Sequence, residues 1–341
     1  MAKDESKQID KIIESINDKY GTNVVVSGDF LREHSGCAVS TGMIGWDIAL
    51  HGGIKEGTIT HIGGLTASGK TTLCLNIAVQ AQKLGKNVYY VDVEGRVQDE
   101  LLDCIEGIDK SKLRFIRSSR EKFLTAEEYL SIIEDIIKDD PGCVIILDSL
   151  AALCPEAEFT TEMSEMQRAT MPKLMYKFLR KVAQIIPPNK TIFISITHMQ
   201  ANPSGYGSPL KDVGGNGIQF FASYWLICMS STDIDGKDGK KVGKESKFKV
   251  KKVANGSPGA EPILYITFGK GCDKYADICK IAEDIGILTK GGAWYTLELD
   301  ALKDASGKYP KMQGMENMKT YLQDNPKSYT MLAEKIKEMV L

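Results

Sequence analysis

Apolar runs and amphipathic stretches alternate along the chain from residue 57 to residue 230. Six runs have the composition of buried strands: TITHIG directly before residue 64, NVYYVDVE (87–94), LRFIR (113–117), CVIILDS (143–149), TIFISIT (191–197) and YWLICM (224–229). Stretches with helical spacing of apolar residues lie between most of them, for example TTLCLNIAVQAQKLG and LTAEEYLSIIEDIIKD. This alternation is typical of a mostly parallel sheet covered by helices on both faces, so we expect an α/β fold.

The segment before this core has a different pattern. Residues 5 to 20 carry apolar side chains at helical spacing, which predicts a short amphipathic helix with the face Ile9, Ile12, Ile13, Ile16 and Tyr20. The run NVVVSG follows and predicts a strand. From the pattern alone, this helix could fold back on its own domain or dock on a neighbouring subunit.

Beyond residue 230 the chain changes character again. The dipeptide DG occurs twice in SSTDIDGKDGKKVGKESKFKVKK, which predicts a hairpin. Eight lysines lie between Lys237 and Lys252, and such a run is usually a solvated face. From about residue 270 we expect a small mixed lobe with a helix in KIAEDIGIL, the segment GGAWYTLEL, and helices from Met315 onward.

Composition narrows the class of protein. The chain has 341 residues, of which 43% are hydrophobic and 26% charged, with a net charge of −2. This is the composition of a globular protein, and any polyanion site must be local rather than global. The eight cysteines form no CxxC pair, which favours reduced thiols over a disulfide framework or a zinc site. The charged N-terminus predicts no secretion signal, and no apolar run approaches the roughly 20 residues of a membrane span, so we expect a cytoplasmic location.

The stretch GLTASGKT fits the pattern G-x-x-x-x-G-K-[ST] through Gly64, Gly69, Lys70 and Thr71. It follows a predicted strand and precedes a predicted helix, and this context gives the match its meaning. The glycines allow backbone N–H groups to surround phosphate oxygens at a helix N-terminus. Lys70 can neutralise the β and γ phosphates, and the hydroxyl of Thr71 can bind a magnesium ion.

Polar side chains end three further strands. Asp148 ends CVIILDS at the sheet edge where open α/β folds bind ligands, and it can orient magnesium or its water. Asp92 and Glu94 end the strand YYVDVE, where a carboxylate could take a proton from water attacking a γ-phosphate; a helix cap or a surface acid is the alternative. His198 ends TIFISITH and is either a γ-phosphate sensor or an ordinary strand-end histidine.

These motifs, in this order, resemble the bacterial RecA family of ATP-dependent homologous-recombination enzymes, and the resemblance covers nearly the whole chain. Its further parts are STGMIGWDIALHGGIKEGTI, ILDSLAALCPEAE, GGNGIQFFAS, GGAWY and YLQDNP. The family fold implies a P-loop ATPase core at 35–269, an N-terminal oligomerisation helix and strand at 1–34, and a small α/β C-terminal lobe at 270–341. Because no long acidic tail follows Leu341, we expect a divergent member, such as one from a phage or mobile element.

The resemblance also implies a function. RecA proteins form helical filaments on single-stranded DNA with ATP and Mg²⁺ between subunits, align homologous double-stranded DNA and exchange strands. It assigns Glu94 as general base and Lys252 as a lysine reaching the γ-phosphate of the next subunit. His198 replaces the family's sensing glutamine. Nucleotide contacts are expected from Gly64, Leu65, Thr66, Ala67, Ser68, Gly69, Lys70, Thr71, Thr72, Gln98 and Phe268, and metal contacts from Thr71 and Asp148.

Three further positions depart from the family pattern. The second γ-phosphate lysine is replaced by Ala254, although Lys251 could substitute. Leu101 replaces a tyrosine beside the adenine, and Gln98 replaces an aspartate. Nucleotide selectivity is therefore less firmly predicted than phosphate binding.

The resemblance places two DNA loops in the chain. The first matches Glu158 to about Met171, and the second belongs to MQANPSGYGSPLKDVGGNG, a stretch that could otherwise be a mobile connection. Contacts with the DNA backbone, which position the strand without reading its sequence, are expected from Lys173, Arg180, Gly214, Gly215 and Asn216, with Tyr206 as the aromatic candidate.

Two other functions are compatible with part of this pattern. A ring helicase or clock-type ATPase would share the core, but the N-terminal helix, the GGN segment and the GAWY lobe argue against it. A DNA-coating filament or regulatory protein that hydrolyses ATP poorly would explain Ala254, His198 and Leu101. The retention of Lys70, Glu94 and Asp148 argues against this second alternative.

Overall fold

The computed structural model describes residues 2–21, 24–33, 36–160, 170–201, 210–212, 217–236 and 238–340. The chain forms two compact units, Met1–Cys37 and Ala38–Leu341. The second unit contains both the predicted core and the predicted C-terminal lobe, and our division of these two at residue 270 stays a prediction. Within the described part of the chain, none of the helices has the length and apolarity needed to span a bilayer.

The first unit consists of helix α1 (Ala2–Tyr20) and the short helix α2 (Gly28–Glu33). The helix predicted over residues 5–20 is therefore confirmed. The strand predicted in NVVVSG is wrong, because residues 24–27 form no ladder and α2 begins at Gly28. The side chain of Asn17 explains the difference: its amide accepts a hydrogen bond from the Val25 N–H at 2.9 Å and donates one to the Val25 carbonyl at 3.1 Å.

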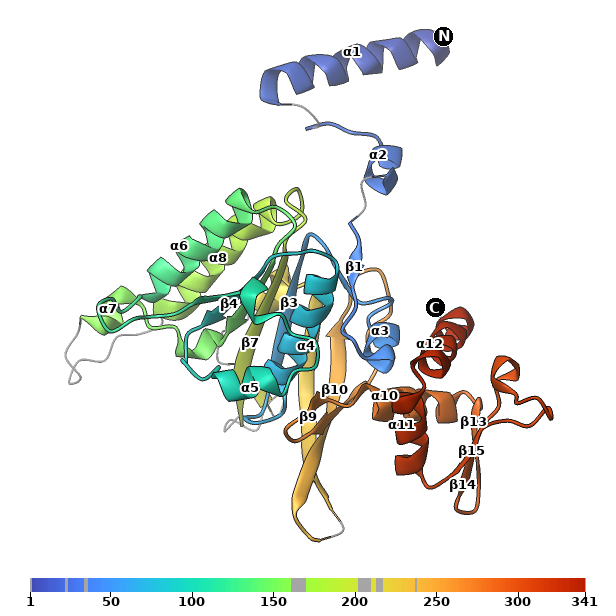
Figure 1. Cartoon of the computed structure of the whole chain (residues 1–341). Helices are drawn as coiled ribbons and strands as arrows, with labels where there is room; N and C mark the ends of the chain where they lie inside the picture. Colours follow the sequence, from blue (N-terminus) through green and yellow to red (C-terminus); the bar gives the residue numbers. More distant parts are fainter. Residues whose placement is uncertain are drawn as a thin grey trace. The chain divides into compact units, whose positions relative to one another are not determined.

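A ten-stranded sheet forms the centre of the second unit (Figure 1). Its spatial order is β12-β11-β10-β9-β3-β7-β6-β4-β5, with β8 paired to β7. The six strands from β9 to β5 in this order run parallel, and β10, β11, β12 and β8 pair antiparallel. The strands are β3 (Thr58–Gly64), β4 (Val88–Asp92), β5 (Leu113–Ile116), β6 (Val144–Asp148), β7 (Ile192–Ala201), β8 (Leu210–Asp212), β9 (Tyr224–Asp235), β10 (Lys241–Lys252), β11 (Ile263–Thr267) and β12 (Gly271–Cys272).

The alternation of apolar residues along β6 explains why helices cover both faces of this sheet. Val144 and Ile146 pack into the cluster that contains helix α4, whereas Ile145 and Leu147 pack into the cluster that contains α6 and α8. The predicted two-sided parallel sheet is therefore confirmed. The helices of this region are α3 (Ile44–Ala49), α4 (Lys70–Lys83), α5 (Asp99–Asp103), α6 (Ala126–Asp139), α7 (Glu156–Phe159), α8 (Thr170–Ile185) and α9 (Gly217–Phe221).

Several small elements complete this unit. Strands β1 (Ala38–Val39) and β2 (Ile54–Lys55) form a two-stranded sheet. Strands β9 and β10 form the predicted hairpin, which is thereby confirmed. Short 3₁₀ turns span Lys110–Lys112, Leu150–Ala152 and Asp300–Leu302.

The C-terminal lobe combines helix α10 with a three-stranded antiparallel sheet and two final helices. Its elements are α10 (Lys274–Asp284), β13 (Leu288–Gly291), β14 (Trp294–Leu297), β15 (Lys311–Gln313), α11 (Met315–Asp324) and α12 (Pro326–Val340). The helix predicted in KIAEDIGIL starts earlier and ends sooner than expected. Gly286 adopts a left-handed φ of 79° and ends it, so that Leu288 begins a strand instead.

The lobe is joined to the core through a buried carboxylate. Asp277 on α10 is 3% exposed and accepts a hydrogen bond from the Gly45 N–H of α3 at 2.8 Å. A Cβ atom at Gly45 would lie 2.6 Å from Asp277 Oδ1, so only glycine allows this close approach. Burial, with smaller contributions from the Asp47 and Asp273 carboxylates, raises the pKa of Asp277 to about 7.

This pKa predicts that stability falls with rising pH. A carboxyl whose pKa is raised in the folded state stabilises the fold below its ordinary value of 3.8 and loses that contribution as pH rises toward about 7. Over this window the loss approaches about 1.4 kcal/mol per pH unit. Asn at this position cannot ionise, so in urea unfolding at pH 4 to 7 Asp277→Asn should show a flatter pH profile than the unsubstituted protein. Parallel profiles would contradict the assignment.

Candidate nucleotide site

A cavity of about 540 Å³ lies at the carboxyl edge of the parallel strands. The β3–α4 loop, the ends of β4, β6 and β7, and the segment from Ile266 to Gly271 contribute its walls. Open α/β sheets bind ligands at this edge because several parallel strands end there together. The predicted phosphate loop and the predicted strand-end acids therefore meet in one place.

The loop between β3 and α4 has the conformation that a phosphate cradle requires. Gly69 has φ of 85° and Ala67 has φ of 57°, so both lie in the left-handed region. A Cβ atom at Gly69 would lie 2.3 Å from Ile266 Cδ1, which adds a steric reason for glycine. The loop ends at the N-terminus of the 14-residue helix α4, where N–H groups without helical partners favour anions.

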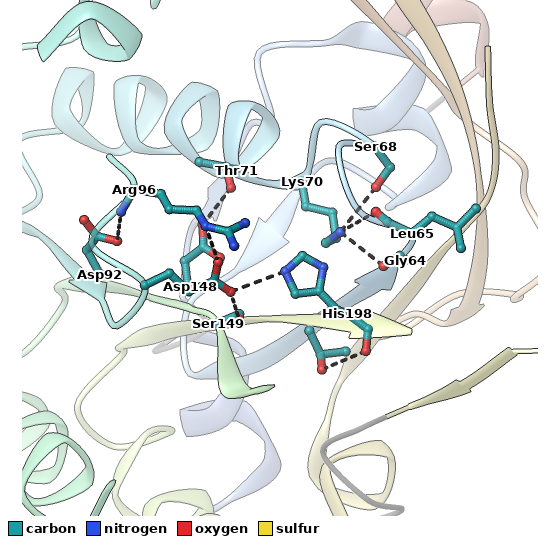
Figure 2. Close-up of polar contacts among 12 residues, drawn as sticks. Gly64, Leu65, Ser68, Lys70, Thr71, Asp92, Arg96, Asp148, Ser149 and His198 are labelled. Atoms are coloured by element: carbon teal, nitrogen blue, oxygen red, sulfur yellow. Dashed lines mark hydrogen bonds and ion pairs between the residues drawn. The ribbon is translucent and has the colours of Figure 1, made fainter. Parts of the chain in front are cut away.

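Lys70 is 4% exposed at the base of the loop. Its Nζ donates to the carbonyl of Gly64 at 3.2 Å and to that of Leu65 at 2.8 Å (Figure 2). Burial lowers the pKa of Lys70, whereas the Asp148 carboxylate raises it. Lys70 Nζ also donates to the Ser68 hydroxyl at 3.4 Å, and a buried ammonium held by these neutral oxygens provides a favourable position for an anionic phosphate.

Thr71 and Asp148 are brought together at the other side of the cavity. The hydroxyl of Thr71 donates to Asp148 Oδ2 at 2.6 Å (Figure 2). The hydroxyl of Tyr90 donates to the same oxygen at 2.7 Å. A hydroxyl and a carboxylate next to a phosphate cradle are hard oxygen donors of the type that Mg²⁺ prefers. The residues present therefore fit a nucleotide with its magnesium ion.

Glu94 lies within reach of three donors. Ser149 Oγ donates to its Oε1 at 2.6 Å, His198 Nε2 lies 3.3 Å from that oxygen, and Arg96 Nε lies 2.9 Å from Oε2. Its side chain is 14% exposed. A partly solvated carboxylate held in place by neighbours is suited to accept a proton from water. Ser149 and Arg96 were missed by sequence reasoning, because a serine or an arginine next to an acid has no distinctive spacing.

The second acid of this strand, Asp92, has a structural role. It is 2% exposed, forms an ion pair with Arg117 at 3.2 Å, and accepts from the N–H groups of Arg96 and Val97. These contacts leave its oxygens engaged with the protein itself. Both acids line the cavity, but Asp92 is 2% exposed, whereas the Glu94 side chain is 14% exposed, so Glu94 is the more accessible of the two.

His198 lines the cavity from within β7, where it is paired in register with Gly64. The strand does not end at His198 as predicted, because pairing with β8 extends it to Ala201. Its Nδ1 is buried and has no hydrogen-bond partner among the described residues. An unsatisfied buried nitrogen is costly, and a ligand oxygen would satisfy it. This geometry fits the predicted sensing role.

The expected base-binding end of the cavity is less polar than the phosphate end. Leu101 and Phe268 both line it, and Phe268 is 47% exposed. Gln98, in contrast, is the residue before α5 and is not part of the lining. An aromatic ring and an aliphatic side chain can enclose a planar base, but they offer no hydrogen bond that would select one base.

Lys244 on β10 is a further residue of the cavity that sequence reasoning missed. Its Nζ donates to the carbonyl of Ala67 in the phosphate loop at 2.8 Å and lies 3.5 Å from Asp233 Oδ1. It belongs to a run of eight lysines, and neither the number of lysines nor their charge distinguishes it from the other seven. Strand alternation could have done so, because Ser246, Phe248 and Val250 on the same face of β10 are buried.

Lys252, also on β10, does not line this cavity. Its Nζ instead donates to the Phe220 carbonyl at 3.2 Å. Its expected contact is with the nucleotide of another subunit, so this assignment stays a prediction.

The predicted DNA-binding residues that the structure describes lie on α8. Lys173 and Arg180 are seven residues apart on its exposed face, opposite the buried Phe178 and Leu179. Lys177, which sequence reasoning missed, is also exposed and lies between them at helical spacing. Tyr206, Gly214, Gly215, Asn216 and most of the predicted first loop lie outside the described residues.

The contact of Lys244 with the loop predicts a measurable loss of nucleotide affinity. Lys244→Met removes a charge-assisted hydrogen bond to the loop that holds the phosphates, and such bonds contribute about 1.5–3 kcal/mol. We expect the Kd of a fluorescent ATP analogue to rise roughly tenfold, which corresponds to 1.4 kcal/mol. Lys240→Met, on the exposed end of the same hairpin, is the matched control and should bind like the unsubstituted protein. Equal Kd values for both variants would refute a role in nucleotide binding.

Comparison with known proteins agrees with this geometry. The RecA N-terminal domain family matches residues 7–273, and the RecA C-terminal domain family matches residues 276–341. Protein RecA of Streptomyces venezuelae is 32% identical over 98% of this chain and 85% of its own length. Protein RecA of Phytoplasma mali is 30% identical over 97% and 94%, and that of Nautilia profundicola 31% identical over 99% and 93%. The chain is therefore a divergent member of the RecA family of nucleotide-binding, ATP-dependent DNA recombinases.

Proposed function

We propose that this chain forms a helical filament on single-stranded DNA, aligns it with homologous double-stranded DNA and exchanges strands, using ATP and Mg²⁺. The observation that carries the proposal is the convergence of Lys70, Thr71, Asp148 and Glu94 in one cavity. A chain that only coated DNA would not need a positioned acid beside its phosphate loop. We also propose a cytoplasmic location.

Each residue of the cavity has a role in this proposal. Bound Mg²⁺ would supply positive charge that stabilises the transferred phosphoryl group. Lys70 would exchange its carbonyl partners for phosphate oxygens, and Thr71 and Asp148 would hold the ion. Glu94 would accept the proton of the attacking water while Ser149 and Arg96 keep its carboxylate in place.

Exposed apolar side chains support the proposed assembly. Ile9 and Ile12 on α1 are 57% and 53% exposed, and Phe220 on α9 is 77% exposed. Large apolar side chains at such exposure favour contacts with another subunit. In such an assembly Lys252 would reach the nucleotide of the neighbouring copy.

The basic face of α8 supports the proposed DNA contact. Lys173, Lys177 and Arg180 present three positive charges along one side of a 16-residue helix. Contacts of this kind neutralise backbone phosphates and carry no sequence information. This suits an enzyme whose DNA bases must stay free to test homology.

One alternative of the same fold deserves a test, namely a DNA-coating filament that hydrolyses ATP weakly. Ala254 and Leu101, together with His198 in place of glutamine, favour it. The geometry around Glu94 favours the active enzyme. Turnover measurements separate the two.

The first test is ATP hydrolysis with and without single-stranded DNA. We expect DNA to stimulate turnover, and Glu94→Gln to reduce it by about 10²–10⁴-fold, the usual contribution of a general base. The amide can still accept from Ser149, so the Kd for ATP should change little. Lys70→Ala should instead abolish nucleotide binding.

Two results would contradict this proposal. DNA binding without stimulated turnover would shift the assignment to the weakly hydrolysing filament. Unchanged ATP binding by the Lys70 variant would refute the phosphate-loop assignment.

A second test concerns the basic face of α8. Arg180→Ala should weaken binding of single-stranded oligonucleotides of different sequence by a similar factor, and should lower the salt dependence by about one phosphate contact. Lys181→Ala is the matched control on the same helix, because Lys181 is paired with Glu134 at 2.6 Å. A loss confined to some sequences, or an equal loss in the control, would count against the assignment.

A further inference from the structure

A second cavity, of about 430 Å³, lies next to the nucleotide cavity and is lined by several lysines. Helix α4, the start of α10 and one side of α12 from Tyr329 to Lys337 contribute its walls, and α12 lies beside α3 in Figure 1. We call it the rear cavity. Four lysines line it: Lys83, Lys270, Lys274 and Lys337.

The charges of the rear cavity do not balance. Among the described residues, two carboxylates line it, and both already have hydrogen-bond or ion-pair partners within the protein. Asp47 is 4% exposed and accepts from the N–H and hydroxyl of Thr41 at 2.7 and 2.8 Å, and also from Ser40. Glu106 forms an ion pair with Lys274 at 3.1 Å.

Three of the lysines have no carboxylate partner. Among the described residues, no carboxylate lies within ion-pair distance of Lys83, Lys270 or Lys337. Lys83 donates to the side-chain oxygen of Gln80 at 3.4 Å, and Lys337 acts on Asp47 at longer range. Four ammonium groups against two engaged carboxylates leave an excess of two positive charges around one concave surface. Such a surface attracts anions with more than one charge.

Neutral donors line the same surface. The amides of Asn76 and Gln80 project from α4, and Gly42 lies against both of them. One N–H of the Asn76 amide donates to the Thr41 carbonyl at 2.7 Å, which leaves its second N–H and those of Gln80 as donors. A Cβ atom at Gly42 would lie 2.5 Å from Asn76 Nδ2 and 2.8 Å from Gln80 Nε2. Lysine ammonium groups combined with amide donors form a suitable environment for phosphate oxygens.

The rear cavity shares structure with the nucleotide cavity. Ile105 lines both, and adjacent residues of one turn divide between them, since Gly271 faces the first while Lys270 and Cys272 face the second. Helix α4 also carries Lys70 at its start and Lys83 at its end. An anion in the rear cavity would therefore contact the elements that form the nucleotide cavity.

We propose that the rear cavity is a second anion site that binds a group with two or three linked phosphates. The phosphates can come from a free polyphosphate or nucleotide, or from the backbone of DNA. The site goes beyond the proposed function, because it does not require that this chain hydrolyse ATP or exchange strands.

The test uses the full chain with its nucleotide cavity filled by a fluorescent, non-hydrolysable ATP analogue and Mg²⁺. Tripolyphosphate is titrated by calorimetry while analogue fluorescence reports any displacement. We expect one equivalent to bind without displacement, and Lys270→Ala/Lys337→Ala to weaken it at least tenfold. Lys308→Ala/Lys327→Ala is the matched control, because it removes two exposed lysines outside both cavities, and it should bind normally.

Three outcomes would overturn the proposal: no binding up to millimolar tripolyphosphate, release of the analogue in step with binding, or equal losses in the two double variants.

A competing 15-base-pair duplex then identifies the source of the phosphates. Displacement of tripolyphosphate by duplex, weakened in the Lys270/Lys337 variant but not in the control, assigns the site to DNA. Binding of tripolyphosphate that duplex does not disturb assigns it to a small anion. Both double variants replace exposed side chains, and thermal melting confirms that they fold.

Discussion

The hydrogen bond between Thr71 and Asp148, 2.6 Å long, joins two elements that are 77 residues apart in the sequence. It can form only if β3 and β6 run parallel and end at the same edge of the sheet, with β7 between them. The same constraint places Glu94 and His198 at this edge, because Glu94 follows β4 by two residues and His198 lies in β7 opposite Gly64, the last residue of β3. The topology of the sheet therefore determines the chemistry of the cavity, and local sequence supplies only the individual groups.

The sequence predicts well those features that repeat or that depend on neighbours in the chain. The alternation of Val144 to Leu147 predicts a two-sided sheet, and GLTASGKT predicts the loop at its edge. Prediction from sequence fails where a side chain from another segment determines the local backbone structure or completes the site. Asn17 takes the backbone bonds of Val25 that a strand would need, and Lys244 reaches across 177 residues to Ala67.

The cavity also separates acids that look equivalent in sequence. Asp92 ends β4 and Glu94 follows two residues later, and both line the cavity. Asp92 is neutralised by Arg117 and held by backbone amides, whereas Glu94 is the more exposed of the two. Lys70 lies opposite, with a pKa lowered by burial and supported by Asp148. The site is thus arranged before any ligand arrives, which reduces the reorganisation that binding and reaction require.

The position of His198 within β7 has a mechanical consequence. This ten-residue strand is held in register by β3 and β6 along its first part and ends at Ala201, three residues beyond His198. At about 3.3 Å per residue, the end of the strand is only about 10 Å from the histidine that contacts Glu94. The three residues after His198 pair antiparallel with β8, from Met199 opposite Asp212 to Ala201 opposite Leu210. The histidine is therefore held by strand pairing both before and after it, and its ring keeps its place beside Glu94 because the backbone on either side is fixed.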